Sequence, residues 1–178
     1  MPTSHWQQIN EIVDLIMGIR PKSILDIGVG FGKYGVLARE YLELWDGRGT
    51  YDNWKVRIDG IEVFSQYKNP IYDFIYDNIY YGDALKVVPL MGTKYDLILM
   101  IDVIEHFNKD EGLQLIDDCI KISRHIIVST PLIVTDQGAA FNNQHETHKA
   151  TFTVSDFSNC KTVVPNSRSL ICVLSCQG

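Results

Sequence analysis

Three glycines follow a short apolar stretch near the amino-terminal end of this chain. The stretch ends in an acidic residue, Asp26, and the glycines alternate at Gly28, Gly30 and Gly32 before a helical pattern begins. Glycine lets the backbone turn sharply and approach a ligand closely, and N–H groups at the start of a helix can point toward that ligand. The segment therefore predicts a nucleotide-like ligand lying over a strand-to-helix turn.

The exact spacing in this turn separates the possible ligands. A P-loop requires G-x-x-x-x-G-K-[ST], but Gly28 to Gly32 is one residue too short and Tyr34 replaces the hydroxyl residue that would hold magnesium. A dinucleotide fingerprint, G-x-G-x-x-G, can be aligned on Gly30, Gly32 and Gly35. That alignment places the Asp26 carboxylate near a pyrophosphate, which it would repel. An NAD-linked oxidoreductase is therefore a less favoured alternative, and a turn without any ligand is another.

The segment Asp26-Ile-Gly28-Val-Gly30-Phe-Gly32 resembles the first motif of the class I methyltransferases that use S-adenosylmethionine (SAM). In that family an acidic residue is followed by G-x-G-x-G after the first strand. SAM carries a cationic sulfonium and an ammonium group and no phosphate, so a nearby carboxylate suits it. The resemblance extends from Ile24 to the end of the chain and is closest to the small-molecule branch of the family.

Acidic residues stand after the next strands, as the resemblance requires. It implies that Glu62, with Val63, binds the ribose hydroxyls, and that Asp83 and Ala84 bind the adenine ring. It also implies that Ile101 and Asp102 lie at the methionine end. Without a ligand, Glu62 would be a solvated charge and Asp83 a helix N-cap. The predicted cofactor-binding residues are Asp26, Gly28, Gly30, Gly32, Glu62, Val63, Asp83, Ala84, Ile101 and Asp102.

Histidines are the candidate proton acceptors, because their pKa lies near neutral pH. His106 follows the fourth strand, where it would face the transferred methyl group, and His145 and His148 lie in a long loop. The alternatives are a packing role for His106 and solvent exposure for the other two. His145 and His148, with Glu146, could also be metal ligands, but His-x-x-His in a loop is a weak metal pattern and we expect no metal.

The elements that must position these residues alternate between strands and helices. The last two strands must be antiparallel, because the turn 165–168 is too short for a parallel crossover. We therefore predict an α/β fold, a three-layer αβα sandwich with a seven-stranded, mostly parallel sheet and an antiparallel C-terminal strand. Residues 1–178 would form a single methyltransferase domain, with residues 1–20 as an N-terminal helix covering the core. The predicted strands are 22–27, 54–63, 79–81, 95–101, 125–129, 161–164 and 169–176. The predicted helices are 5–18 (capped by Ser4), 32–45, 69–76, 109–123 and a turn at 154–157, with loops at 46–53 and 132–151.

Composition narrows the classes of partner and compartment. The net charge is −6 and the sequence pI is about 5.3, which makes nucleic acid an unfavoured partner because such binding relies on Lys and Arg. The chain has no leader-like start and no apolar run of membrane-spanning length, so we expect a cytoplasmic protein without a membrane association. Its four cysteines form no C-x-x-C pair, and we expect reduced thiols, with Cys172 and Cys176 on one face of a strand.

The resemblance implies a SAM-dependent methyltransferase that acts on oxygen or nitrogen of a small molecule. Few segments are available for acceptor recognition, since the chain has no large insertion after the fifth strand. A protein partner that completes the acceptor site is therefore a further expectation. The main alternative is a catalytically inactive module that binds SAM or a partner.

Overall fold

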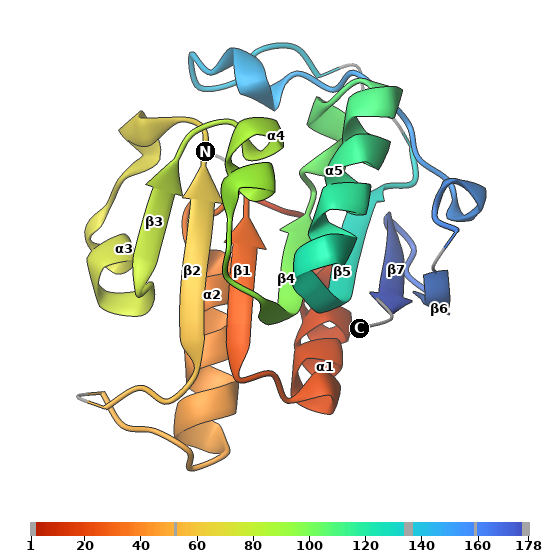
Figure 1. Cartoon of the computed structure of the whole chain (residues 1–178). Helices are drawn as coiled ribbons and strands as arrows, with labels where there is room; N and C mark the ends of the chain where they lie inside the picture. The colour runs from red at the N-terminus through yellow and green to blue at the C-terminus, as the bar shows by residue number, and fades with distance from the viewer. Residues whose placement is uncertain (1–2, 52, 134–136, 159, 176–178) are drawn as a thin grey trace.

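A single mixed sheet organises this computed structural model, which describes residues 3–51, 53–133, 137–158 and 160–175. The strand order is β3-β2-β1-β4-β5-β7-β6 (Figure 1). Neighbours are parallel from β3 to β5, whereas β7 is antiparallel to both β5 and β6. The predicted antiparallel C-terminal strand is thus confirmed. The strands are β1 Ser23–Ile27, β2 Arg57–Glu62, β3 Asn78–Tyr81, β4 Tyr95–Ile101, β5 Ser123–Pro131, β6 Cys160–Val164 and β7 Ser169–Ser175.

Helices cover both faces of the sheet and create two apolar cores. Helices α1 (Ile9–Ile19), α2 (Lys33–Arg39) and α3 (Pro70–Ile75) pack on one face, and α4 (Ala84–Val87) and α5 (Lys109–Ile122) pack on the other (Figure 1). Successive residues of β4 point into opposite cores: Ile98 into one and Leu99 into the other, both fully buried. A central parallel strand has this pattern because both of its faces are covered. The predicted three-layer sandwich is confirmed.

The amino-terminal helix begins later than the sequence pattern predicts. A 3₁₀ turn, Trp6–Gln8, precedes α1, and the ring of His5 accepts a hydrogen bond from the Gln7 N–H at 3.3 Å. Ser4 is therefore not the helix cap. Its hydroxyl instead donates to Tyr34 Oη at 3.3 Å and lies 3.1 Å from Lys33 Nζ, so Ser4 belongs to the surroundings of the glycine turn.

The predicted helix 32–45 changes geometry midway. After Arg39 the helix continues as a π-helical segment, Glu40–Trp45. The change coincides with the buried pair Arg39–Glu43, which also takes up the backbone before β2: the Lys55 and Val56 N–H groups donate to Glu43 Oε1 at 2.8 and 2.6 Å. Because these donors bind a side chain, β2 begins at Arg57 and not at residue 54 as predicted.

Other boundaries shift where side chains or strand partners extend an element. The pairing of β5 with β7 continues through Pro131, so β5 is longer than predicted at both ends. Helix α4, which the sequence analysis did not predict, begins at the N-cap Asp83 and leads into a 3₁₀ turn, Val88–Leu90. The described part of the predicted loop 132–151 contains one short 3₁₀ turn, Gln144–Glu146.

The cysteine prediction is confirmed for the residues that the structure describes. Cys119, Cys160 and Cys172 are reduced and take part in no disulfide within the described residues. Cys176 lies outside the described residues, so its predicted place on a shared strand face is not tested. Within the described ranges, none of the helices combines the length and the apolar character needed to cross a bilayer.

Candidate functional site

A cavity of about 590 Å³ lies over the carboxyl ends of the parallel strands. Its volume falls within the usual range for small-molecule sites, and its position is the one where open α/β sheets bind ligands. Most of the predicted cofactor-binding residues line it: Asp26, Gly28, Gly30, Glu62, Val63, Asp83, Ala84, Ile101 and Asp102. The three candidate histidines, His106, His145 and His148, line the same cavity. The sequence motifs therefore converge on one space.

The glycine turn uses its N–H groups inside the protein. Gly28 N donates to Ile61 O at 2.9 Å, and Gly30 N donates to Glu62 Oε2 at 2.9 Å. The prediction that these donors point toward a ligand is therefore wrong for Gly28 and Gly30. Their contribution is a wall without side chains, held at φ +77 and +55, where glycine has no steric penalty.

Gly32 is not among the residues that line the cavity. It begins α2 at φ +94, and its N–H donates to Val29 O at 2.8 Å. A Cβ at this position would lie 3.0 Å from Ile71 Cγ2. Gly32 thus shapes the turn and permits close packing against α3.

Asp26 is buried beneath the turn, and Tyr76 Oη donates to its carboxylate at 2.6 Å. Burial raises the pKa of Asp26 to about 6, opposed by the Tyr76 hydrogen bond and reinforced by the negative charge of Glu62. Burial and Asp26 together raise the pKa of Tyr76 well above 10, so Tyr76 remains the donor. A cation above the turn would favour the ionised form of Asp26.

Glu62 connects the end of β2 to the glycine turn. One carboxylate oxygen accepts from Gly30 N at 2.9 Å and the other from Phe64 N at 2.8 Å. Burial raises its pKa, and these two backbone N–H groups oppose the rise. A carboxylate can accept about four hydrogen bonds, so Glu62 can still accept from a ligand. Its cross-link to the turn was not predicted from sequence.

Asp83 has the alternative role that its sequence context allows. Its carboxylate accepts from Leu85 N at 3.0 Å, which caps α4, while the residue also lines the cavity. Ala84, the first residue of that helix, is buried beside it. The capping role fixes the position of the Asp83 side chain at the cavity wall.

Asp102 fastens the amino-terminal segment over the cavity. Gln8 Nε2 donates to its Oδ2 at 2.6 Å, the His5 N–H donates to the same oxygen at 3.1 Å, and Ser129 Oγ donates to Oδ1 at 3.0 Å. Asp102 has φ +54, a left-handed conformation that is uncommon outside glycine and frequent at functional sites. His5 and Tyr34 line the cavity as a result.

The loop 137–148 closes the cavity from another side. Tyr67, which follows β2, donates its hydroxyl to Glu146 Oε1 at 2.9 Å, and Asn143 Nδ2 donates to Tyr67 Oη at 3.2 Å. Gln137 Nε2 holds the loop to itself by donating to Glu146 O at 2.7 Å. All four residues line the cavity. Glu146 was considered only as an alternative metal ligand, and the other three were not predicted as site residues. Their polar loop context gave no distinguishing sequence signal.

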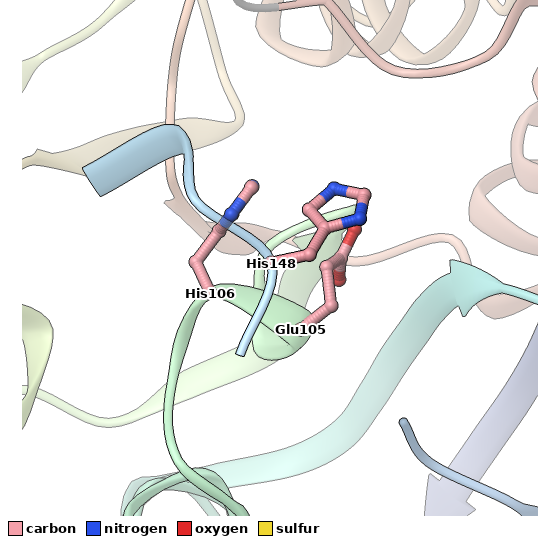
Figure 2. A group of neighbouring side chains, drawn as sticks. All are labelled: Glu105, His106 and His148. Atoms are coloured by element: carbon pink, nitrogen blue, oxygen red, sulfur yellow. The ribbon is translucent and has the colours of Figure 1, made fainter. Parts of the chain in front are cut away.

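Two of the predicted histidines form a group with a residue that sequence reasoning missed. Glu105, His106 and His148 carry metal-ligating atoms that all lie within 4.8 Å of one another (Figure 2). His145 is exposed and outside this group, so the structure does not pair it with His148 as a metal site. Glu105 directly precedes His106 and was not among the predicted site residues, and it is only 3% exposed.

Burial dominates the electrostatics of this group. It lowers the pKa of His106, which favours the neutral imidazole, although the Thr147 carbonyl opposes the shift. Burial and the negative charge of Asp102 raise the pKa of Glu105 well above its ordinary value. A neutral His106 imidazole beside a buried carboxyl group can accept a proton or bind a cation.

No protein-family model and no curated protein sequence matches this chain significantly. Solved structures do resemble it. The N-terminal domain of EvdMO1, crystallised with SAH and D-fucose, has 11% sequence identity and a TM-score of 0.67 over 98% of this chain and 85% of that one. Magnesium protoporphyrin IX methyltransferase from Synechocystis PCC 6803, with bound SAH, has 13% identity and a TM-score of 0.60 over 96% and 83% of the two chains.

An O-methyltransferase family protein from Burkholderia thailandensis has 11% identity and a TM-score of 0.65 over 93% of this chain. This chain has the fold of the class I SAM-dependent methyltransferases. The fold predicted from the resemblance of Asp26 to Gly32 is therefore confirmed. The chain spans only 55% of the length of the Burkholderia protein, and identities this low establish the fold alone.

Proposed function

We propose that this chain binds SAM in the cavity and transfers its methyl group to an oxygen or nitrogen atom of a small molecule. The observation that carries the proposal is the convergence of the glycine turn, Glu62, Asp83 and Asp102 on one cavity. The SAH named for two of the similar structures supports the choice of cofactor. The amino-terminal segment and the sheet would act together as one domain.

The polar groups of the cavity suit the parts of SAM. Asp83 and Ala84, at the start of α4, would bind the adenine, and Glu62 would accept from the ribose hydroxyls. The methionine portion would then lie between Gly28 and Asp102, above the buried Asp26. These carboxylates favour a cationic ligand, whereas the phosphates of NAD would be repelled.

Methyl transfer from a sulfonium is an in-line displacement at carbon. Charge disperses in its transition state, so catalysis depends on aligning the acceptor with the methyl group in a site from which water is excluded. The segment held by Asp102 and the loop held by Tyr67 form the walls that would exclude water. The cavity of about 590 Å³ leaves room for a small acceptor beside SAM.

His106 would accept a proton or position the acceptor, because it lines the cavity and burial lowers its pKa, which favours the neutral imidazole. His145 and His148, from the loop opposite, are further candidates for acceptor contact. A protein partner that completes the acceptor site stays a prediction, as does a non-catalytic role in binding SAM.

Calorimetry with SAM and with NAD tests the cofactor, and formation of S-adenosylhomocysteine across a panel of hydroxyl and amine acceptors tests the reaction. We expect SAM to bind and NAD not to compete. Tighter binding of NAD than of SAM would overturn the cofactor assignment. Binding of SAM without turnover of any acceptor would favour the inactive module.

His106→Ala sharpens the test. A catalytic or acceptor-contacting His106 predicts a larger loss in turnover than in SAM affinity. An equal loss in both would assign His106 a packing role.

A further inference from the structure

We infer that Glu105, His106 and His148 bind a divalent transition-metal ion that holds an oxygen atom of the acceptor. Their metal-ligating atoms lie within 4.8 Å of one another, and all three residues line the cavity (Figure 2). Two imidazoles and one carboxylate suit Zn²⁺, Fe²⁺ or Co²⁺ better than Mg²⁺ or Ca²⁺, which prefer oxygen ligands. The acceptor role of this ion rests on the proposed methyl transfer, whereas the binding of the ion does not.

The backbone holds the two ligand-bearing segments together. Glu105 and His106 lie in the turn after β4, and His148 lies in the loop that crosses it. The Lys149 and Ala150 N–H groups both donate to the Glu105 carbonyl, at 2.8 and 3.2 Å. The His148 N–H donates to Gln137 O at 3.0 Å. These contacts fix the relative position of the ligands before any ion binds, which lowers the cost of forming the site.

The orientation of His106 is also that of a metal ligand. Its Nδ1 lies 3.2 Å from the Thr147 carbonyl oxygen. A carbonyl can only accept a hydrogen bond, so Nδ1 carries the hydrogen and Nε2 presents its lone pair. Metal-ligating histidines commonly donate their second N–H to a carbonyl or carboxylate in this way.

Glu105 supplies independent evidence that this site would bind a cation. It is 3% exposed, and its Oε2 has no hydrogen-bond partner among the described residues. Within the described chain it forms no ion pair, and the charged groups that face it, Asp102 and Glu146, are both acidic. A buried carboxylate is costly without a compensating charge, and a divalent ion among these acids would supply one.

Three protein ligands leave open positions for exogenous oxygen ligands. An acceptor hydroxyl bound there would lose its proton to solvent more readily, because the ion stabilises the oxygen anion. That oxygen forms a bond to the SAM methyl carbon while the electron pair of the carbon–sulfur bond passes to sulfur. The products are a methyl ether, S-adenosylhomocysteine and one released proton. The metal site therefore favours a hydroxyl acceptor over an amine.

The test uses the full chain, treated with a chelator and then titrated with Zn²⁺ by calorimetry and with Co²⁺ by visible absorption. We expect one ion per chain. Glu105→Gln and His148→Ala should each weaken binding by about 100-fold or more, whereas His145→Ala, in the same loop but outside the group, should leave it unchanged. Absence of Zn²⁺ and Co²⁺ binding, or undiminished binding in both ligand variants, would overturn the site.

The same samples separate the metal site from the proposed function. Circular dichroism shows whether Glu105→Gln folds. His148→Ala, at a partly exposed loop residue, provides a second variant if it does not. SAM affinity is measured independently by calorimetry. Metal binding without SAM binding would remove the methyltransferase function and leave the metal site in place. SAM binding and metal-independent methylation by chelated protein would remove the acceptor role of the ion.

Discussion

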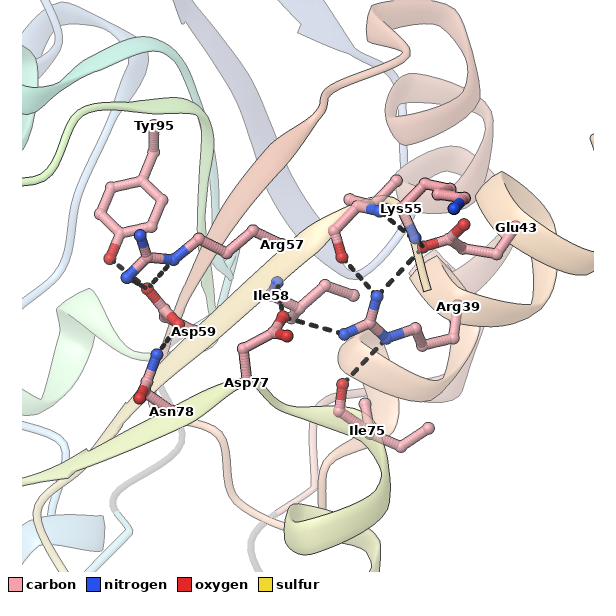
Figure 3. A network of polar contacts seen from close by, with 11 residues as sticks. Arg39, Glu43, Lys55, Arg57, Ile58, Asp59, Ile75, Asp77, Asn78 and Tyr95 are labelled. Atoms are coloured by element: carbon pink, nitrogen blue, oxygen red, sulfur yellow. Dashed lines mark hydrogen bonds and ion pairs between the residues drawn. The ribbon is translucent and has the colours of Figure 1, made fainter. Parts of the chain in front are cut away.

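Buried charged side chains at the two ends of the sheet differ in whether the chain supplies their partners. Near the amino ends of the strands, Arg39 is 2% exposed and donates to the Ile75 carbonyl at 2.9 Å and to the carboxylates of Glu43 and Asp77 at 3.1 and 3.0 Å (Figure 3). Near the carboxyl ends, Glu105 is as deeply buried, and one of its oxygens has no partner in the described chain. The first charge is balanced by the chain itself, and the second is not.

Asp59, in β2, is another buried charge whose partners are supplied by the chain itself. Its carboxylate accepts from Tyr95 Oη at 2.6 Å and Asn78 Nδ2 at 2.9 Å, and it pairs with Arg57 at 2.7 Å (Figure 3). Glu43 does keep one oxygen without a partner, but its other oxygen accepts three N–H groups, one of them from Arg39. Charges that the chain satisfies belong to folding, whereas charges left over at the cavity are available to a ligand.

The largest expected effect comes from breaking the satisfied network. Arg39→Ala leaves Glu43 buried without its cation, and we expect the free energy of unfolding to fall by about 3–5 kcal/mol. Urea denaturation measures the change. Arg124→Ala is the control, because the Arg124 side chain is 77% exposed and lies 3.6 Å from Asp96, so it should have little effect. A loss below about 1 kcal/mol for Arg39→Ala would contradict the proposed division between the two ends.

Features set by local residue types could be predicted from the sequence, whereas features set by a distant side chain could not. The apolar run Tyr95–Ile101 predicts a strand because a strand buried on both faces requires apolar residues. The turn from Asp26 to Gly32 is predicted because backbone with positive φ favours glycine. The sheet, its antiparallel strand and the cavity position followed from them. Boundaries set by one side chain did not: Glu43 shortens β2 from a distance in sequence.

Site residues show the same limit. Residues with a family motif, such as Glu62 and Asp83, were placed on the cavity wall from sequence alone. Glu105 was missed because an acidic residue between two strands usually faces solvent, and only the tertiary fold shows that it is buried. The latch formed by Tyr67, Asn143 and Glu146 joins positions far apart in the chain, so local patterns carry no trace of it.

At the cavity end, Glu62→Ala should weaken SAM binding by about 1–3 kcal/mol, or roughly 5- to 150-fold, through loss of charge-assisted hydrogen bonds. Calorimetry measures the affinity. The Glu62 carboxylate also holds the Gly30 N–H, so urea denaturation must accompany the measurement. Unchanged SAM affinity in a folded variant would remove Glu62 from the proposed site. Asp118→Ala, in α5, paired with Lys121 and not among the residues that line the cavity, is the matched acidic control.

The pH dependence of SAM affinity tests the buried carboxyl group beneath the turn. Burial raises the pKa of Asp26 to about 6 in the free protein. A cationic ligand favours the ionised form and lowers that pKa, so affinity should rise with pH up to about 6 and then level off. We expect SAM affinity, measured by calorimetry, to rise roughly tenfold between pH 5 and pH 7. The α-amino group of SAM stays protonated over this range, so its own titration does not contribute. Asp26→Asn should flatten the profile, and an equally steep profile in that variant would assign the dependence to another group.

The smallest expected effect concerns the latch across the cavity. Tyr67→Phe removes the hydroxyl that donates to Glu146 and accepts from Asn143 while keeping the ring that packs against Phe64. Because Glu146 is only partly buried, we expect the free energy of unfolding to fall by about 0.5–1.5 kcal/mol. Limited proteolysis should cut the loop 137–148 faster in the variant, since its link to the segment after β2 is lost. Tyr51→Phe, at an exposed tyrosine away from the cavity, controls for removal of a hydroxyl. Equal proteolysis in the two variants would mean that the loop is held by its own contact from Gln137 and not by the link to Tyr67.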